Sequence, residues 1–383
     1  MSTRSGAVQT VLGPVPSEQV GITLPHEHVL IDMTMGASSA TALLGSTESV
    51  ERASAQPEAG LEPGQNGPGV AASFTAKWGR PVTLETRGDI ERYWFFYGNY
   101  RLTDIDDAIY EANLFKRHGG SCLVDQTPRG LARDPRGLVQ IARATGVHIV
   151  MGAGFYSQHH HPSNMSALSL GRIQDLITGD IVDGVAGGIK AGIIGEVGLS
   201  WPLHPNEEKS LRASIRSQKE TGCGLSIHPG YSPDSVWDAI RIIEEEGGDL
   251  SRIAFSHVEH RLPSRPAPHS FDPKPFLDLA ATGASLLLDG FGREASHRQR
   301  GPIDDPNDSV RLNYLMTLAE AGYENQLLIS HDLALQHWYR RYGGFGWQHI
   351  PDTVQQLMRY KGFDQGLIDR ILIENPRRLL TFS

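Results

Sequence analysis

The chain of 383 residues contains only two cysteines, Cys122 and Cys223, and they lack the CxxC spacing of a metal or redox motif. Long apolar runs are missing too, since the longest fall far short of the roughly 18 residues that a membrane helix requires. The stretch after Met1 has no apolar core of a signal peptide. We therefore expect a cytoplasmic protein without a membrane partner, whose two cysteines are small buried fillers in a reducing compartment.

Basic residues are scarcer than acidic ones. Lys and Arg number 35 against 44 Asp and Glu, which gives a formal net charge of -9 and a pI near 6.0. Binding to nucleic-acid phosphates needs an excess of Lys and Arg on some surface, and the sequence shows no basic cluster of that kind. The charge balance argues against a nucleic-acid partner and leaves a small-molecule substrate as the expected one.

Short apolar runs recur along the chain, and each is followed by a longer segment of helical character. The runs are GITLPHEH, GSCLVDQT, VHIVMGAG, AGIIGEVG, CGLSIHPG, RIAFSHVE, ASLLLDG and QLLISHD. Apolar strands separated by helix-length segments are typical of a parallel sheet that helices cover, because such strands are buried on both faces. Eight such units, with no GxGxxG motif after the first, predict an α/β protein with a (β/α)8 TIM barrel rather than an open dinucleotide-binding sheet.

Two of the intervening helices have clear end signals. We expect one to begin after Thr103 as N-cap and to end at Gly119. A second is expected to have Asn206 before an acidic first turn and Gly222 after its last residue.

Residues 36–90 do not fit the alternation of strands and helices. They are rich in Gly, Ala, Ser and Pro, and a loop of this length inside a compact domain is usually functional or disordered. We interpret them as an insertion after the first strand, within a single barrel domain that spans residues 1–383. The aromatic residues Trp94, Phe95 and Phe96, which follow this segment, are expected to pack on the barrel.

Metal-ligating residue types stand at the ends of most predicted strands, where the active groups of such barrels gather. They are His26 and His28 on the first strand, Glu196 on the fourth, His228 on the fifth, His257 on the sixth and Asp332 on the eighth. Side chains alternate along a strand, so His26 and His28 point to one side and Glu27 points away. Any one of these residues alone is more often structural than a ligand. Their joint occurrence predicts a metal site suited to Zn, Mn, Co or Ni rather than Ca.

In these motifs the chain resembles the phosphotriesterase-related proteins of the amidohydrolase superfamily over almost its whole length. The sequence LPHEH is similar to the HxH signature of that family, SIHPG and FSHVEH to its later single histidines, and ISHD to its closing aspartate strand. The sequence ENPRRLL is similar to its terminal helix. The resemblance implies a hydrolase with a binuclear metal centre.

The resemblance also implies which residues hold each metal. His26, His28 and Asp332 would bind the more buried ion, and His228 and His257 the more exposed one. We expect two zinc ions, with Mn, Co or Ni as alternatives.

The bridging ligand is the point at which this sequence departs from many relatives, which carry a carboxylated lysine at the position of Gly195. Lys190 and Glu196 are the possible replacements, and at about 3.3 Å per residue they lie roughly 20 Å apart along the strand. Only Glu196 is at the catalytic end, and it resembles the glutamate bridge found in a subset of the family. Because neighbouring side chains point to opposite faces, we expect a bulge or local twist at Gly195 to turn Glu196 inward.

The expected reaction is hydrolysis of a small ester, lactone or amide by a hydroxide that bridges two metal ions. Water shared by two cations loses its proton near neutral pH, and the exposed metal polarises the bond under attack. Asp332 is the predicted catalytic residue, because it is placed to take that proton and to pass it to the leaving group.

The substrate pocket is less well defined by the sequence. The candidate contacts are Tyr156, Trp338, Arg340, Arg341 and Trp347. Tyr156 aligns with a tyrosine that helps to form the pocket of lactonase-type relatives, and the others lie in an aromatic loop expected to overhang the barrel mouth. For each of them, packing of the loop or the core is the alternative role. Those lactonases also carry an arginine where this chain has Gly290, and Arg293 is either its replacement or a solvated side chain.

Three other functions compete with this hypothesis. Phosphotriesterase activity is the alternative within the family. A barrel that binds a small molecule without converting it is the non-catalytic alternative. Retention of all six expected ligands favours an enzyme over a binding protein, since a binder has no need for Asp332 beside a metal. An isomerase or aldolase barrel is disfavoured because no predicted strand ends in lysine. We expect the protein to form a homodimer.

Overall fold

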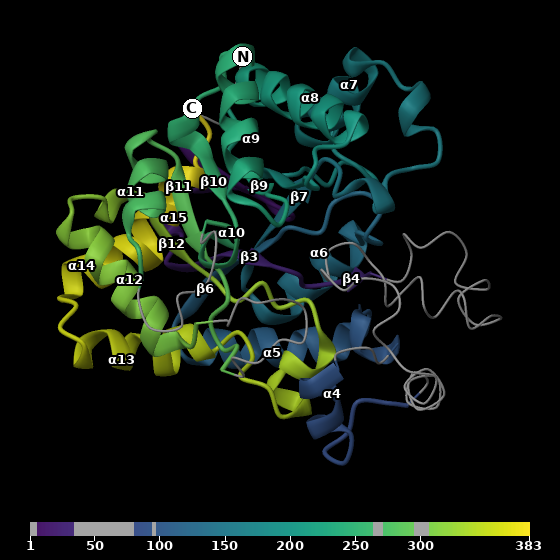
Figure 1. Cartoon of the computed structure of the whole chain (residues 1–383). Helices are drawn as coiled ribbons and strands as arrows, with labels where there is room; N and C mark the ends of the chain where they lie inside the picture. Colours follow the sequence, from purple (N-terminus) through teal and green to yellow (C-terminus); the bar gives the residue numbers. More distant parts are fainter. Residues whose placement is uncertain (1–5, 34–79, 94–96, 263–270, 295–305) are drawn as a thin grey trace, which may run out of the picture.

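A closed barrel of parallel strands forms the centre of the computed structural model, which describes residues 6–33, 80–93, 97–262, 271–294 and 306–383 (Figure 1). The 8 strands are β3 (Ile22–Glu27), β6 (Gly120–Asp125), β7 (His148–Ala153), β8 (Ile193–Gly198), β9 (Leu225–His228), β10 (Ile253–Phe255), β11 (Ser285–Leu288) and β12 (Leu327–Ile329). Each lies within one of the predicted apolar runs and pairs with its neighbours in chain order. The amide of Asp332 donates to the carbonyl of His26 at 3.0 Å, which joins the last strand to the first. The predicted (β/α)8 barrel is confirmed.

Helices surround the strands on the outside of the barrel (Figure 1). They are α4 (Arg87–Tyr93), α5 (Ile105–Arg117), α6 (Pro135–Thr145), α7 (Leu170–Val182), α8 (Pro205–Thr221), α9 (Pro233–Glu246), α10 (Val258–Arg261), α11 (Lys274–Ala281), α12 (Asp308–Glu320), α13 (Gln355–Tyr360), α14 (Gln365–Asp369) and α15 (Asn375–Leu380). The last of these lies within the predicted terminal helix. Within the described ranges, no helix has both the length and the apolar character needed to cross a bilayer.

The starts of two helices differ from prediction, while their ends agree. The side chain of Asp104, not Thr103, caps α5 by accepting from the amides of Asp106 and Asp107. Helix α8 begins at Pro205, because proline suits the first helical position, and the His204 side chain caps it instead of Asn206.

The helix ends follow the glycine signals. Gly222 closes α8 in the left-handed conformation, and Gly119 has a φ of 92° just after α5. Glycine adopts these angles without the penalty that a Cβ would add, which explains why this signal was reliable.

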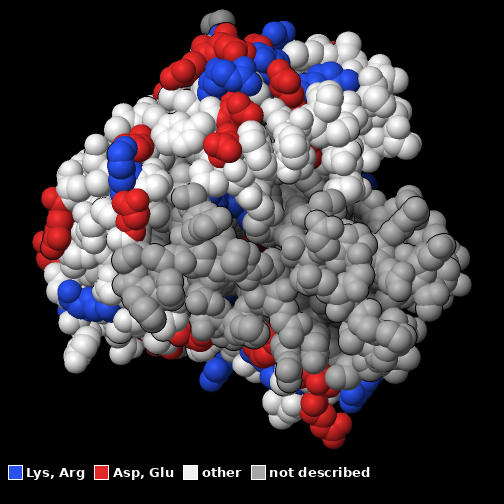
Figure 2. All heavy atoms as spheres, in the orientation of Figure 1, with Lys and Arg blue, Asp and Glu red and all other residues white. Residues whose placement is uncertain are grey.

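Acidic and basic side chains are interspersed on the outer face of α8 and α9, at the top of Figure 2. Arg212 pairs with Glu245 at 2.7 Å and with Glu246 at 3.0 Å, and Arg216 pairs with Glu246 at 2.7 Å. Exposed pairs of this kind add little to stability.

Apolar side chains fill the barrel interior below the mouth. Cys122, Val150, Ile193 and Leu287 belong to one buried cluster, together with Val8 from the hairpin of β1 (Ala7–Thr10) and β2 (Gly13–Pro16). The hairpin thus lies under the amino-terminal ends of the strands, opposite the predicted catalytic face. Burial raises the pKa of the Cys122 thiol to about 12, so this side chain is an inert filler as predicted.

The pairing of β8 with β9 is irregular at the predicted position. The register shifts between Ile194 and Val197, and Gly195 has a φ of 151°. This irregularity replaces the strict alternation of the strand, so the Glu196 carboxylate faces His228 on the neighbouring strand. The expected bulge is therefore confirmed.

The ends of the predicted insertion lie side by side. Strand β4 (Ile31–Asp32) precedes the segment and pairs antiparallel with β5 (Arg101–Leu102), which follows it. Most of the predicted insertion at 36–90, and all of Trp94, Phe95 and Phe96, lie outside the described residues. The single-domain assignment stays a prediction.

Replacement of Gly195 by alanine should disturb the end of β8. A Cβ there would lie 2.9 Å from Gln126 Oε1 and from Ser226 Cβ, at a backbone angle that alanine rarely adopts. We expect a loss of about 1–3 kcal/mol in the free energy of unfolding, measured by urea denaturation. Gly171→Ala on exposed α7 is the matched control, because nothing lies within 4 Å of the added methyl group. Equal stability of the two variants would show that Gly195 is not required there.

Candidate metal centre

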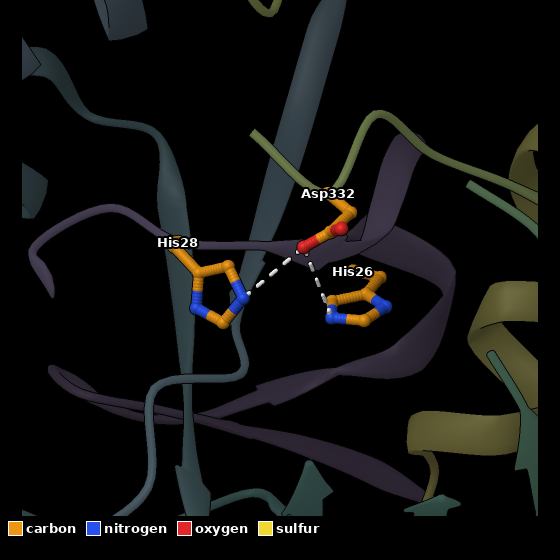
Figure 3. Close-up of side chains that lie close together, drawn as sticks. All are labelled: His26, His28 and Asp332. Atoms are coloured by element: carbon orange, nitrogen blue, oxygen red, sulfur yellow. Dashed lines mark ion pairs between the residues drawn. The ribbon is translucent and has the colours of Figure 1, made fainter. Parts of the chain in front are cut away.

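The predicted ligands converge at the carboxyl-terminal mouth of the barrel. His26 and His28 leave β3 on the same side, and Asp332 reaches them from the turn after β12 (Figure 3). Asp332 Oδ1 lies 3.2 Å from His28 Nε2 and 3.7 Å from His26 Nε2. The structure therefore brings together the three residues predicted to hold the more buried metal.

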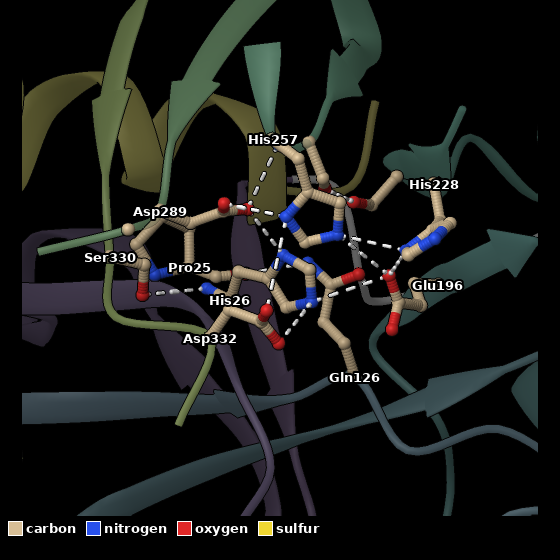
Figure 4. A network of polar contacts seen from close by, with 12 residues as sticks. Pro25, His26, Gln126, Glu196, His228, His257, Asp289, Ser330 and Asp332 are labelled. Carbon is tan, nitrogen blue, oxygen red and sulfur yellow. Dashed lines mark hydrogen bonds and ion pairs between the residues drawn. The ribbon is translucent and has the colours of Figure 1, made fainter. Parts of the chain in front are cut away.

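The Glu196 carboxylate lies between two groups of imidazoles. Its Oε1 is 3.4 Å from His28 Nε2. Its Oε2 is 3.5 Å from His26 Nε2 and 3.6 Å from His257 Nε2 (Figure 4). A carboxylate that contacts imidazoles of both predicted ligand groups has the arrangement of a bridging ligand. Lys190 precedes β8 at the opposite end of the strand, as expected.

His228 completes the second group. Its Nδ1 lies 2.8 Å from Glu196 Oε2 and 2.8 Å from His257 Nε2. The predicted pair His228 and His257 therefore faces the Glu196 carboxylate from the two adjacent strands β9 and β10. Through these contacts, all six predicted ligands meet in one place.

Asp289, which follows β11, is a residue that the sequence reasoning missed. Its Oδ2 lies 2.8 Å from His26 Nδ1 and its Oδ1 lies 2.7 Å from His257 Nδ1. When each Nδ1 carries a proton and donates it to Asp289, each Nε2 is left unprotonated and faces the cluster, as metal binding requires. Asp289 stands at the carboxyl end of a strand, so the same rule that identified the ligands would have found it.

A buried nitrogen indicates that the residues fit metal ions. His26 is fully buried, and its Nε2 makes no hydrogen bond within the described part of the chain. An unsatisfied buried polar atom is costly, and a cation among these imidazole and carboxylate groups would satisfy it. The donor set is one that zinc and similar ions prefer.

Mutual attraction dominates the electrostatics of the cluster. Burial lowers the pKa of His28 and of His257, but the neighbouring carboxylates outweigh it and raise each pKa to about 9. Burial likewise raises the pKa of Glu196, but His228 and His26 hold it well below its usual range. The carboxylates are therefore ionised, and cations that bind there must displace protons from the imidazoles.

Arg293 is buried beside Asp332, so its interpretation as a solvated side chain is wrong. Its Nη2 lies 2.6 Å from Asp332 Oδ2 and donates to the carbonyls of His331 and Asp332 at 3.0 and 2.9 Å. Burial raises the pKa of Asp332, but Arg293 and the imidazoles lower it further than burial raises it. Arg293 thus fixes the orientation and the charge of the predicted catalytic carboxylate.

Glu27 holds the chain on both sides of Asp332. Its Oε1 accepts from the amide of His331 at 2.9 Å and from Ser330 Oγ at 2.7 Å, and its Oε2 accepts from the amide of Leu333 at 3.0 Å. Asp332 has a φ of 50°, a strained angle for a residue other than glycine. The middle residue of the HEH motif points away from the metal site, as predicted, and stabilises the turn that presents Asp332.

The five candidate substrate contacts lie in three kinds of environment. Tyr156 and Trp338 lie at the site: the Tyr156 hydroxyl is 3.3 Å from His228 Nε2, and Trp338 lies under the Arg293 guanidinium at 4.4 Å. Trp347 is buried against Tyr339, and Arg341 pairs with Asp107 of α5 at 2.8 Å. Arg340 is exposed. Trp347 is therefore part of the core, and a contact of Arg341 with substrate stays a prediction.

Comparison with known proteins agrees with this geometry. Residues 6–380 match the model of the phosphotriesterase family. The N-acetyltaurine hydrolases of Bos taurus and Homo sapiens are each 36% identical to this chain, over 100% of both lengths.

Two solved structures extend the comparison. A resiniferatoxin-binding protein from Rhodobacter sphaeroides is 30% identical, with a TM-score of 0.83 over 98% of this chain and 95% of that one. A lactonase from Listeria monocytogenes is 21% identical, with a TM-score of 0.71 over 98% of this chain and 99% of that one, which supports the fold.

Loss of the Glu27 carboxylate should destabilise the turn at Asp332. Glu27→Ala leaves buried amides without an acceptor, so we expect a loss of about 3 kcal/mol in the free energy of unfolding. Glu27→Gln keeps one acceptor oxygen and should lose less. Urea denaturation measures both, with Glu374→Ala, whose side chain is 57% exposed, as the control. A Glu27→Ala variant as stable as the control would contradict the role assigned to Glu27.

Proposed function

Since the chain belongs to the phosphotriesterase family and is a hydrolase, we propose that it cleaves the amide bond of a small N-acyl amine with the help of two divalent cations. N-acetyltaurine is the proposed representative substrate, because relatives with that activity in their name match the chain from end to end. The observation that carries the proposal is the Glu196 carboxylate, which lies within 3.6 Å of a ring nitrogen of all four histidines. Its Oε1 faces His28, and its Oε2 faces His26, His228 and His257.

The proposed cations are zinc, with Mn, Co or Ni as alternatives. His26, His28 and Asp332 would hold one, His228 and His257 would hold the other, and Glu196 would contact both. When bound, such ions supply an activated water and polarise the acyl carbonyl. The partner in this proposal is a small molecule, and the homodimer stays a prediction.

Asp332 is the proposed proton carrier. Its Oδ1 faces His26 and His28, while its Oδ2 is held by Arg293 at 2.6 Å, so the carboxylate cannot turn away. Because its pKa is lowered, Asp332 is ionised and accepts a proton from the attacking water. The water oxygen bonds to the acyl carbon, the carbon–nitrogen bond breaks, and Asp332 returns the proton to the leaving nitrogen. The products are a carboxylic acid, which keeps the second proton of the water, and an amine, and transfer of that proton to the amine gives a carboxylate and an ammonium group.

A binding protein without turnover is the second candidate. The observation in its favour is the likeness to a structure that is named for resiniferatoxin binding. The Asp332–Arg293 pair and the Glu27 contacts around it favour catalysis, since a binding pocket gains nothing from a strained carboxylate held in one orientation.

Metal analysis tests the proposed centre. Protein purified without chelator should contain about two equivalents of divalent metal per chain, as a two-metal site requires. His28→Ala and His228→Ala should each lower the content to about one equivalent, because each removes a ligand of a different ion. Elemental analysis by mass spectrometry measures the content, and Arg241→Gln on exposed α9 serves as control. Wild-type protein with less than one equivalent would count against the centre.

Substitution of Asp332 tests the proton transfer. Asp332→Asn keeps the size of the side chain but removes its basicity, so kcat for release of acetate from N-acetyltaurine should fall by about 100-fold or more. Asp175→Asn, whose side chain is 68% exposed on α7, should keep the wild-type rate. Lactones, carboxylic esters and phosphotriesters complete the substrate panel. Faster turnover of one of these classes than of N-acyl amines would replace the proposed substrate, and an unchanged rate in Asp332→Asn would remove Asp332 from the mechanism.

A further inference from the structure

A buried arginine lies on the outer side of His228. Arg261 is the last residue of α10, directly after the strand that carries His257, and only 3% of its surface is exposed. Its Nη2 lies 3.2 Å from His228 Nε2, and the Tyr156 hydroxyl lies 3.3 Å from the same nitrogen. One imidazole ring therefore separates the Arg261 guanidinium from the Glu196 carboxylate, which contacts the other nitrogen of His228 at 2.8 Å.

The protonation of His228 decides what this corner can bind. Its Nδ1 faces Glu196 and His257, so this is the nitrogen available to a cation. A ring nitrogen that binds a cation carries no proton, so the proton of neutral His228 is then on Nε2. Nε2–H then lies within 3.3 Å of two further donors, the Arg261 guanidinium and the Tyr156 hydroxyl. An acceptor, best an anion, can receive hydrogen bonds from these groups together.

The Tyr231 ring connects this corner with the surface. The Arg261 guanidinium lies over the ring at 3.5 Å from its centroid, and 46% of the Tyr231 surface is exposed. Stacking of this kind holds the plane of a guanidinium in place. The Arg261–Tyr231 pair thus lies between the metal-ligand cluster and the solvent, where the distal part of a substrate would lie.

The second buried arginine at the mouth has a different task. Arg293 is held by Asp332 Oδ2 at 2.6 Å and by two main-chain carbonyls, so its donors serve the catalytic carboxylate. Arg261, on the side of His228, is therefore the buried arginine that a substrate group extending outward from the ligand cluster would meet.

We infer that Arg261, Tyr156 and His228 Nε2 form an anion subsite that binds the acidic group of the leaving amine. The ligand class is an N-acyl amino acid or amino sulfonate, in which a two- or three-atom linker separates the amide from a sulfonate or carboxylate. This inference rests on the proposed amide hydrolysis and adds to it the residue that selects the charged substrate.

Matched charged and neutral substrates test the subsite. We compare kcat/KM for N-acetyltaurine and for N-acetylethanolamine, which lacks the charge, in wild type, Arg261→Gln, Arg261→Lys and Arg241→Gln. Loss of a charge-assisted hydrogen bond should lower the preference for the charged substrate by about 30-fold or more in Arg261→Gln. Arg261→Lys should retain part of the preference, and Arg241→Gln, whose side chain is 53% exposed, should retain all of it. An equal loss on both substrates in Arg261→Gln would show a purely structural role and overturn the inference.

A binding measurement separates this inference from the proposed function. Propane-1-sulfonate, which has no amide to cleave, is titrated into metal-loaded wild type, Arg261→Gln and Arg241→Gln by calorimetry. We expect Kd to rise by about tenfold or more in Arg261→Gln alone. If wild type cleaves no N-acyl amine but sulfonate binding still depends on Arg261, the proposed reaction fails and the subsite stands. If sulfonate binds Arg261→Gln as well as it binds wild type, or fails to bind wild type, the subsite is overturned.

Discussion

The inward orientation of one carboxylate determines what this barrel can do. Glu196 reaches the cluster because the chain leaves the regular pleat at Gly195, where a Cβ would meet Ser226 and Gln126. Had the strand kept its alternation, the carboxylate would point toward the helices, and the four histidines of the site would lack a common anionic partner. Gly195 and Glu196 together thus take the place of the bridging lysine that the family resemblance leads us to expect.

Around that carboxylate, two further buried carboxylates have basic partners. Asp289 holds His26 and His257 by their Nδ1 atoms, and Arg293 holds Asp332. Burial of any one of these charged groups alone would carry a large desolvation penalty. Their mutual contacts offset that penalty and fix which atoms face the centre. The surrounding contacts therefore determine ligand orientation as much as the backbone does, and this explains how a strained residue such as Asp332 keeps its place.

The sequence predicted the strands and the ligands because both depend on local patterns. Apolar runs identified all 8 strands of the barrel, and chemistry at the strand ends identified His26, Glu196 and the other ligands. What it missed depends on contacts between distant segments. No pattern near Arg293 shows that it lies against Asp332, and nothing near Arg341 shows that Asp107 binds it. Helix starts failed for a smaller reason, since several adjacent residues such as Thr103 and Asp104 can serve as caps.

The contact of β3 with β12 has a consequence for the order of events during synthesis. His26 donates its amide to Ser330 Oγ across a separation of 304 residues, and Asp332 follows two positions later. A ribosome adding about 5–20 residues per second exposes His26 and His28 many seconds before Asp332 exists. An ion that met the nascent chain early would find a pair of imidazoles and no closing carboxylate. The full set of metal ligands therefore comes together only when β12 contacts β3 and the barrel closes.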